Sequence, residues 1–225
     1  MKRTIGYFGD SFCAQRQEKI GSWPTYMELI EQALDVTTTH VGVDGSSVGD
    51  LVLNQFMPLA HRQQLPDISV FVWTNHSRLF HRTKRGINIR SCADPKGDPI
   101  LEAAKDYYTH LWDGDYSLLE YTAIIKHFDR DILRQVQHAT QILHLWSFGE
   151  PKILEPREAE ENFRQGRVYY PHDFETGREL RPPLMTIALE TASWQDLVTT
   201  PWANHMNTAE KNQQVADLIL GALGS

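Results

Sequence analysis

Cysteine is scarce in this sequence, with only Cys13 and Cys92 among 225 residues. Two thiols cannot form the disulfide framework of a small secreted scaffold, and no Cys or His pair has the spacing of a structural zinc site. There is also no apolar run of roughly 18 residues, the length that a membrane-spanning helix needs. We therefore expect no disulfide scaffold, no metal site and no membrane span.

Positive charge is also in short supply. The 22 Lys and Arg residues face 29 Asp and Glu residues, which gives a formal net charge of −7. Proteins that bind nucleic acids or anionic membranes generally do so through clustered basic side chains. The acidic balance therefore argues against a nucleic-acid partner. The N-terminal segment MKRTIGYFGDS has too short an apolar run for a signal peptide, so the expected location is cytoplasmic.

Composition and length favour one large globular domain. Hydrophobic residues make up 41% of the chain and charged residues 23%, as in an ordinary protein with a buried core. We expect a single domain over residues 1–225. Two segments, at about 80–117 and 149–183, are longer than connections in such a core usually are, and we interpret them as insertions.

Four apolar segments have the pattern of buried strands, and each is followed directly by polar residues. They span residues 4–8, 36–43, 68–73 and 141–146. Helical patterns lie between and after them, with one beginning at Pro24, one over 118–136 and one beginning at Asn207. This alternation predicts a three-layer α/β/α fold with a mostly parallel sheet. Ligands bind such sheets at the carboxyl ends of the strands.

The first strand ends in Gly9-Asp10-Ser11, which places a serine hydroxyl at that edge of the sheet. Taken alone, this tripeptide is more typical of an ordinary turn than of a nucleophile. Further short motifs occur in order along the chain. Together they resemble the blocks of the GDSL/SGNH hydrolase family of serine esterases and lipases: Phe8-Gly9-Asp10-Ser11, Asp44-Gly45-Ser46-Ser47, Trp73-Thr74-Asn75-His76 and His205-Met206-Asn207.

The resemblance implies a flavodoxin-like sheet order, no cofactor, and four catalytic residues: Ser11, Gly45, Asn75 and His205. Elementary chemistry agrees with these roles, because a serine needs an adjacent base and a histidine titrates in the useful pH range. The Ser11 N–H, the Gly45 N–H and the Asn75 amide would stabilise the oxyanion of a tetrahedral intermediate.

Each of these residues also has a plainer interpretation. Gly45 could simply make the turn after the second strand, with Gly42 or Gly49 in the oxyanion position under a shifted alignment. Asn75 could hydrogen-bond its own backbone in a turn. His205 is one of ten histidines and could be a surface or helix-capping residue.

The sequence departs from the family pattern beside the histidine. Members usually carry an Asp three residues before it, but here that residue is Trp202. The resemblance implies that the main-chain carbonyl of Trp202 could orient His205 instead. Asp196 or Glu190 could also fold back onto the imidazole, although neither stands at the family spacing.

The third block departs as well, since Trp73 replaces the usual Gly and His76 the usual Asp. Trp73 either borders the substrate pocket or fills the core. Five basic residues follow this block without an acidic one between them. Either this is a solvated loop, or Arg78 and its neighbours bind an anionic group of the substrate. The residues are Arg78, Arg82, Lys84, Arg85 and Arg90.

These observations predict a serine hydrolase that cleaves a carboxylic ester through an acyl-enzyme. The expected substrate is a short acyl group on a carbohydrate or other small molecule. Two alternatives remain at this point: an acyltransferase on the same scaffold, and a non-catalytic carbohydrate-binding or structural protein. The third block resembles that of phage-encoded relatives, which leaves a virion-associated role open.

Overall fold

A five-stranded parallel sheet forms the centre of the computed structural model, which describes residues 2–14, 23–148, 162, 168, 170–190 and 206–224. The strand order is β2-β1-β3-β6-β7, and every neighbouring pair is parallel. This is the flavodoxin-like order. The second strand is added on one side of β1 and all later strands on the other side, so the strand order reverses between β1 and β3. The strands are β1 (Thr4–Gly9), β2 (Thr37–His40), β3 (Ile68–Trp73), β6 (Gln141–Trp146) and β7 (Arg178–Leu180).

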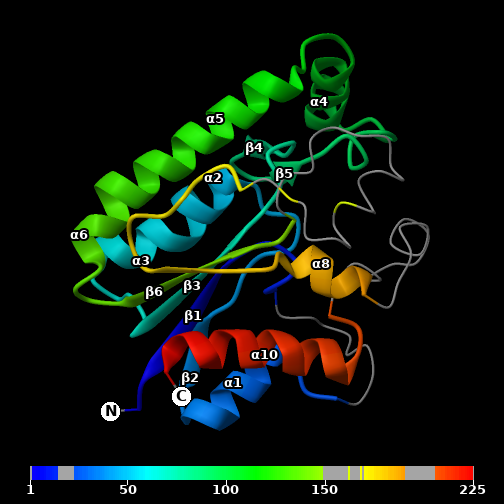
Figure 1. Cartoon of the computed structure of the whole chain (residues 1–225). Coiled ribbons are helices and arrows are strands. Elements are labelled where there is room, and N and C mark those ends of the chain that lie inside the picture. The colour runs from blue at the N-terminus through cyan, green and yellow to red at the C-terminus, as the bar shows by residue number, and fades with distance from the viewer. Residues whose placement is uncertain are drawn as a thin grey trace.

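Helices cover both faces of the sheet, so the predicted three-layer α/β/α fold is confirmed (Figure 1). Two long helices and a short one lie on one face: α1 (Tyr26–Leu34), α8 (Leu184–Leu189) and α10 (Ala209–Leu223). The other face carries two continuous helical segments, each with a π-helical middle turn. They are α2 (Val48–Asp50), η1 (Leu51–Phe56) and α3 (Met57–His61), and then α5 (Gly114–His127), η2 (Phe128–Leu133) and α6 (Arg134–Val136).

Alternation along the strands divides the core into two layers. In β3, Val70 and Val72 pack towards α1 and α10, whereas Phe71 and Trp73 pack towards η1 and η2. Successive side chains of a strand point to opposite faces, so one buried strand supplies both layers. The second layer is rich in aromatic side chains, with Phe8, Phe71 and Trp73 stacked in sequence along the sheet.

Two predicted helix starts are wrong by one or two residues. Helix α1 begins after Thr25 rather than at Pro24, because Thr25 and Glu28 form a capping box. Helix α10 is capped by Thr208 rather than Asn207, since the Thr208 side chain accepts a hydrogen bond from the Lys211 N–H. The strand β7 was not predicted.

Part of the first long segment has regular structure of its own. It contains an antiparallel hairpin and a helix, and the hairpin pairs as a separate two-stranded sheet. Tyr108 fastens the hairpin to the neighbouring loop, because its hydroxyl lies within hydrogen-bonding distance of the Ile87 carbonyl (2.6 Å) and the Ser77 carbonyl (2.5 Å). The elements are β4 (Leu79–His81), β5 (Arg85–Ile87) and α4 (Pro99–His110).

None of the described helices is both long and apolar enough to cross a lipid bilayer.

A buried polar network ties the loop before β7 to the π-helical turn η2. The carboxylate of Asp129 has no exposed surface and accepts hydrogen bonds from His172 Nε2 (2.8 Å) and from the Glu175 N–H (2.7 Å). The backbone N–H and the hydroxyl of Thr176 donate to its other oxygen. Burial by itself would raise the pKa of Asp129, but these hydrogen bonds outweigh it and hold that pKa below its usual value.

His144, in β6, extends this network to Trp73 in the neighbouring strand β3. Its Nδ1 accepts a hydrogen bond from the Trp73 indole N–H (3.2 Å), so its Nε2 carries the proton and donates to the Thr176 carbonyl (3.0 Å). Burial lowers the pKa of His144 to about 3, which keeps the ring neutral at physiological pH. The ring also stacks on Phe174, with centroids 3.7 Å apart.

We expect Asp129→Asn to lower the free energy of unfolding by about 3 kcal/mol at neutral pH, because it removes a buried charged partner of His172. The pKa of an Asp side chain in an unfolded chain is about 3.9. Because the folded pKa is lower, the carboxylate stabilises the fold above that pH and loses this contribution as the pH falls through the folded value. Urea unfolding between about pH 2 and pH 7 measures the difference between the two proteins.

The matched control is Asp131→Asn, which removes an exposed carboxylate from the same helical turn. This change should cost far less stability, as exposed pairs contribute about 0–1 kcal/mol. A difference between wild type and Asp129→Asn that stayed constant down to about pH 2 would contradict the assigned direction of the Asp129 pKa shift.

Candidate active site

Three of the four predicted catalytic positions lie at the carboxyl ends of neighbouring strands in the sheet. Ser11 lies two residues beyond β1, and Asn75 lies two residues beyond β3. These strands are neighbours, with Gly9 paired to Val72, so both positions leave the sheet side by side. Gly45 follows β2, the neighbour of β1 on the other side.

The carboxylate of Asp10 joins the ends of three strands. It has no exposed surface, and its Oδ2 accepts a hydrogen bond from the Thr74 hydroxyl (2.8 Å), beside Asn75. Its Oδ1 accepts from the Ser147 hydroxyl (3.1 Å) and from the Phe12 N–H (3.1 Å). The turn that carries Ser11 is therefore fixed to the residues that follow β3 and β6.

Gln55 fixes the Gly45 turn to the same strand. From η1 its side chain accepts a hydrogen bond from the Gly9 N–H (2.9 Å) and donates to the Gly9 carbonyl (2.9 Å). Its Nε2 also lies 2.9 Å from the Ser46 hydroxyl, which donates to Asp50 (2.6 Å). Gln55 is 3% exposed, so these bonds replace solvent for a buried amide. No motif in the sequence pointed to Gln55.

The structure distinguishes among the three glycines considered for the oxyanion position. A Cβ on Gly42 would lie 2.4 Å from the Cys13 sulfur, and one on Gly49 would lie 2.9 Å from the Phe80 ring. Among the described residues, no atom lies within 4 Å of the corresponding point on Gly45, which has φ +76°. Gly45 thus borders open space and adopts a backbone conformation that favours glycine.

Asn75 makes the turn contact that its plainer interpretation predicted. Its Oδ1 accepts a hydrogen bond from the Ser77 N–H (2.6 Å). That contact fixes the orientation of the amide but uses only its oxygen. The Nδ2 group, which is the donor that an oxyanion would need, does not take part in the turn. The two interpretations of Asn75 are therefore compatible.

Ser11 is 8% exposed at the edge of the described structure. Cys13, two residues further along, is fully buried, and burial together with the Asp10 carboxylate raises the pKa of its thiol well above the usual value. A buried neutral thiol is a poor nucleophile. Cys13 is therefore a poor rival to Ser11 as a nucleophile.

The Arg78 side chain contacts both the turn at Gly45 and the turn at Ser11. Its Nη1 donates to the Ser46 carbonyl (3.1 Å), and its Nη2 lies 3.7 Å from Asp10 Oδ2. The side chain is 12% exposed. The guanidinium therefore links the residue after Gly45 to the residue before Ser11. Lys84, from the same basic stretch, pairs with Asp98.

Trp73 takes the second of its two predicted roles. It has no exposed surface, packs against Phe71 and Phe128, and donates its indole N–H to His144. Its side chain fills the core, so the predicted contact between Trp73 and substrate is wrong.

The remaining predicted positions, His205 and its orienting residue Trp202, lie outside the described residues, as does Asp196. Met206, the next residue along the chain after His205, is 5% exposed. Glu190 is described, and its carboxylate accepts hydrogen bonds from the Gln214 amide (3.1 and 3.2 Å).

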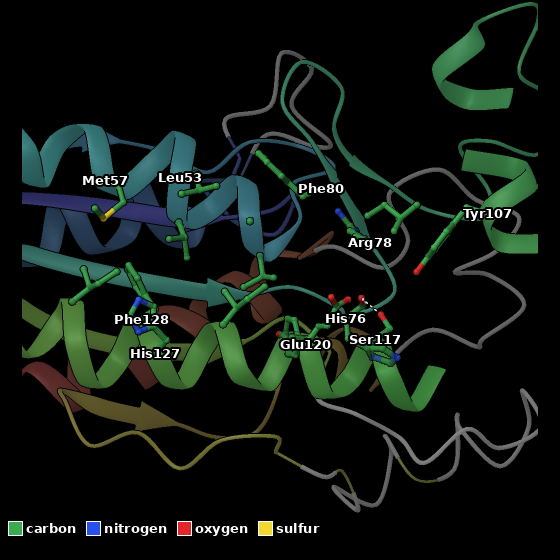
Figure 2. A pocket seen from close by; sticks show the side chains of 17 residues that line it. Leu53, Met57, His76, Arg78, Phe80, Tyr107, Ser117, Glu120, His127 and Phe128 are labelled. Carbon is green, nitrogen blue, oxygen red and sulfur yellow. Dashed lines mark hydrogen bonds between the residues drawn. The ribbon is translucent and has the colours of Figure 1, made fainter. Parts of the chain in front are cut away.

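An apolar groove of about 430 Å³ lies beside these turns, between α5 and the helix that runs from α2 to α3. Figure 2 shows Leu53, Met57 and Phe128 towards one end and His76, Arg78 and Tyr107 towards the other. Ser117 bridges to the His76 carbonyl at this polar end (2.9 Å). Ser11, Gly45 and Asn75 are not among the residues that line the groove.

No protein-family model matches the sequence, and no curated protein matches it. The solved structures to which the chain is similar include two carbohydrate esterases. One is a carbohydrate esterase family 2 enzyme with a carbohydrate-binding domain from Corynascus thermopiles (Myceliophthora fergusii), with TM-score 0.43 and 16% identity over 100% of this chain and 68% of that one. The other is a family two carbohydrate esterase from Clostridium thermocellum in complex with cellohexaose, with TM-score 0.41 and 13% identity over 99% and 65% of the two chains.

The hairpin β4–β5 supports the Gly45 turn, which leads to a prediction about Gly86. A Cβ at this position would lie 2.2 Å from the Gly45 carbonyl and 2.7 Å from the Ser47 nitrogen. Gly86→Ala should therefore displace the turn and lower the free energy of unfolding by about 2–3 kcal/mol, as overpacking does. Chemical denaturation measures the change.

Gly221→Ala is the matched control, because that glycine lies in α10 and an added Cβ there would have no described atom within 4 Å. Alanine favours a helix over glycine by about 1 kcal/mol, so this variant should be as stable as wild type or more so. Equal stability of the two variants would show that the hairpin does not press on the turn.

Proposed function

We propose that this protein is a serine hydrolase that cleaves a carboxylic ester through an acyl-enzyme. The single observation that carries the proposal is the fastening of the Ser11, Gly45 and Asn75 turns at one edge of the sheet by Asp10 and Gln55. Catalysis by oriented donors requires such turns to be rigid before the substrate arrives. The resemblance of the four sequence motifs to the SGNH hydrolases supports the same reaction.

In the proposed mechanism the Ser11 hydroxyl attacks the ester carbonyl carbon, and His205 accepts its proton. The N–H groups of Ser11 and Gly45 and the Asn75 amide stabilise the negative oxygen of the intermediate. The intermediate collapses to an acyl-enzyme, and His205 returns the proton to the departing alcohol. A water molecule then attacks the acyl-enzyme and loses a proton to His205. The second intermediate collapses to release the acid, and His205 returns that proton to the Ser11 oxygen.

The proposed substrate is a short acyl ester of a carbohydrate or other small molecule. A short acyl group fits the surroundings because the apolar groove, the natural place for a long chain, is not lined by Ser11, Gly45 or Asn75. The open space beside Gly45 would admit the carbonyl group to be cleaved.

A fluorophosphonate probe tests the nucleophile. We expect a covalent adduct on Ser11 and turnover of p-nitrophenyl acetate, since the probe reacts only with an activated serine. Ser11→Ala should lose the adduct and lower kcat at least a thousandfold, while its melting temperature stays near that of wild type. A wild-type protein with neither adduct nor turnover would overturn the proposal in favour of a binding role.

The function proposed for Arg78 is to hold the Ser46 carbonyl and the Asp10 carboxylate in register. Arg78→Ala should lower kcat about tenfold for neutral and anionic acetate esters alike, with little change in KM, because it loosens the turn beside Gly45. Steady-state kinetics with matched neutral and anionic esters measures both constants.

Arg82→Ala is the control, since Arg82 is an exposed arginine of the same basic stretch. The sequence also predicted that Arg78 binds a substrate anion. That role would instead raise KM for the anionic ester and leave the neutral ester unchanged. Such a result would replace the positioning role with the binding role.

A further inference from the structure

Three large hydrophobic side chains on the walls of the apolar groove are exposed to solvent. Leu53, Phe80 and Ile124 line the groove and are between 39% and 55% exposed. Single exposed hydrophobic side chains are ordinary, but several gathered around one hollow indicate a binding surface. The groove volume of about 430 Å³ lies within the range of about 300–1,000 Å³ that small-molecule pockets have. The groove therefore has the size and the lining of a ligand site.

The helical segments on both sides of the groove are π-helical where they line it. Val52 and Leu53 belong to η1, and Phe128 and Ile132 belong to η2. A π-helical turn is rare and frequently marks a functional site. The presence of one such turn in each wall is a second observation, independent of the exposed side chains, that points to a role in binding.

Polar side chains gather at the end of the groove that adjoins the candidate active site. His76 at this end directly follows Asn75 in the chain. Arg78 donates a hydrogen bond to the Ser46 carbonyl in the Gly45 turn (3.1 Å). A molecule whose apolar tail lies in the groove would therefore place its head beside both turns. The polar residues at this end are His76, Arg78, Tyr107, Ser117 and Glu120 (Figure 2).

The charges at the polar end favour an uncharged head. Arg78 is a cation, but its Nη2 lies 3.7 Å from the buried Asp10 carboxylate, which balances its charge. Glu120 is an exposed anion and would repel a carboxylate or phosphate, whereas Arg78 would repel an ammonium group. Hydroxyl groups can donate to the Glu120 carboxylate and accept from the Arg78 guanidinium. A sugar ring carries several hydroxyl groups and no charge, so it is complementary to this end.

We propose that the apolar groove binds the aliphatic chain of an alkyl-sugar substrate, with the sugar at the polar end beside the Gly45 and Asn75 turns. The inference rests on the proposed function, since it names the alcohol part of the ester that is cleaved. The short acyl group lies outside the groove, because Ser11, Gly45 and Asn75 are not among the residues that line it. The substrate class is therefore a short acyl ester of a sugar that carries an aliphatic chain.

Isothermal titration calorimetry with ethyl, butyl, hexyl and octyl β-glucoside tests the groove without any reaction. Each methylene that enters the groove should lower Kd up to about fourfold, because burial of apolar surface drives binding. A Kd that does not change with chain length would overturn the proposal, and so would the absence of binding by the octyl compound.

The nature of the head is tested with two ions that carry the same hexyl chain length, hexanoate and hexylammonium. Both should bind about tenfold more weakly than hexyl β-glucoside, because each meets a like charge at the polar end. Equal or tighter binding of either ion would overturn the assignment of a sugar head.

Leu53→Asp and Ile124→Asp place a charge on opposite walls of the groove. Each should raise Kd for hexyl β-glucoside about tenfold or more, because the aliphatic chain would desolvate the carboxylate. Leu119→Asp is the matched control, since Leu119 is an exposed residue of α5 that is not among those lining the groove. Its Kd should equal that of wild type, and melting temperatures verify that all three variants are folded. Equal Kd values for Leu53→Asp and Leu119→Asp would contradict binding in the groove.

Monoacetylated ethyl and hexyl β-glucoside separate a failure of this inference from a failure of the proposed function. Wild type should have a kcat/KM about tenfold higher for the hexyl compound, mainly through a lower KM, and Leu53→Asp should remove the difference. Equal kcat/KM for the two acetates would overturn the groove as a substrate site. A protein that binds the alkyl glucosides in order of chain length but hydrolyses neither acetate would overturn the proposed function and leave an alkyl-sugar binding site.

Discussion

A carboxylate without solvent is costly unless every oxygen is satisfied, and Asp10 meets this requirement at the carboxyl ends of β1, β3 and β6. Its partners are the Thr74 hydroxyl, the Ser147 hydroxyl and the Phe12 N–H. A shift of β3 or β6 would remove one of these hydrogen bonds from a buried carboxylate. The position of Ser11 relative to Asn75 therefore depends on this one group more than on the turns themselves.

The supports around Asp10 come from both layers of helices. Gln55 reaches the Ser11 and Gly45 turns from the helix on one face, and Tyr26 reaches Phe12 from the helix on the other. Arg78, in the loop after β3, contacts the same turns by donating a hydrogen bond to the Ser46 carbonyl. Because these contacts are short and mostly buried, they connect the turns at the carboxyl ends of the strands to one another and to both helix layers.

The apolar patterning was enough to predict the central strands and the layers, since buried strands read as continuous runs of hydrophobic residues. Strand β7 escaped prediction because Arg178–Leu180 is a short edge strand with two charged side chains. Two helix starts were missed by one or two residues because a capping threonine decides them, as Thr25 and Thr208 do here. The helix predicted over 118–136 begins four residues earlier, at Gly114, where Asp113 caps it.

For the site, the motif positions Ser11, Gly45 and Asn75 could be chosen from the sequence, but their supports could not. Gln55 lies 46 residues from Gly9, and Thr74 lies 64 residues from Asp10, so only the fold brings them together. Trp73 was ambiguous in sequence because a large aromatic side chain suits a pocket wall and a core equally well. Its burial decides for the core.

The hairpin β4–β5 shows that the segment at about 80–117 contributes to the structure around the Gly45 turn. A loop that merely decorates a fold can be shortened or exchanged without effect on the rest. Here the Gly86 backbone lies directly behind Gly45, and the Phe80 ring packs on Gly49. Deletion of the segment would expose the back of the Gly45 turn to water. A change in the length of this hairpin would therefore alter the support of the Gly45 turn.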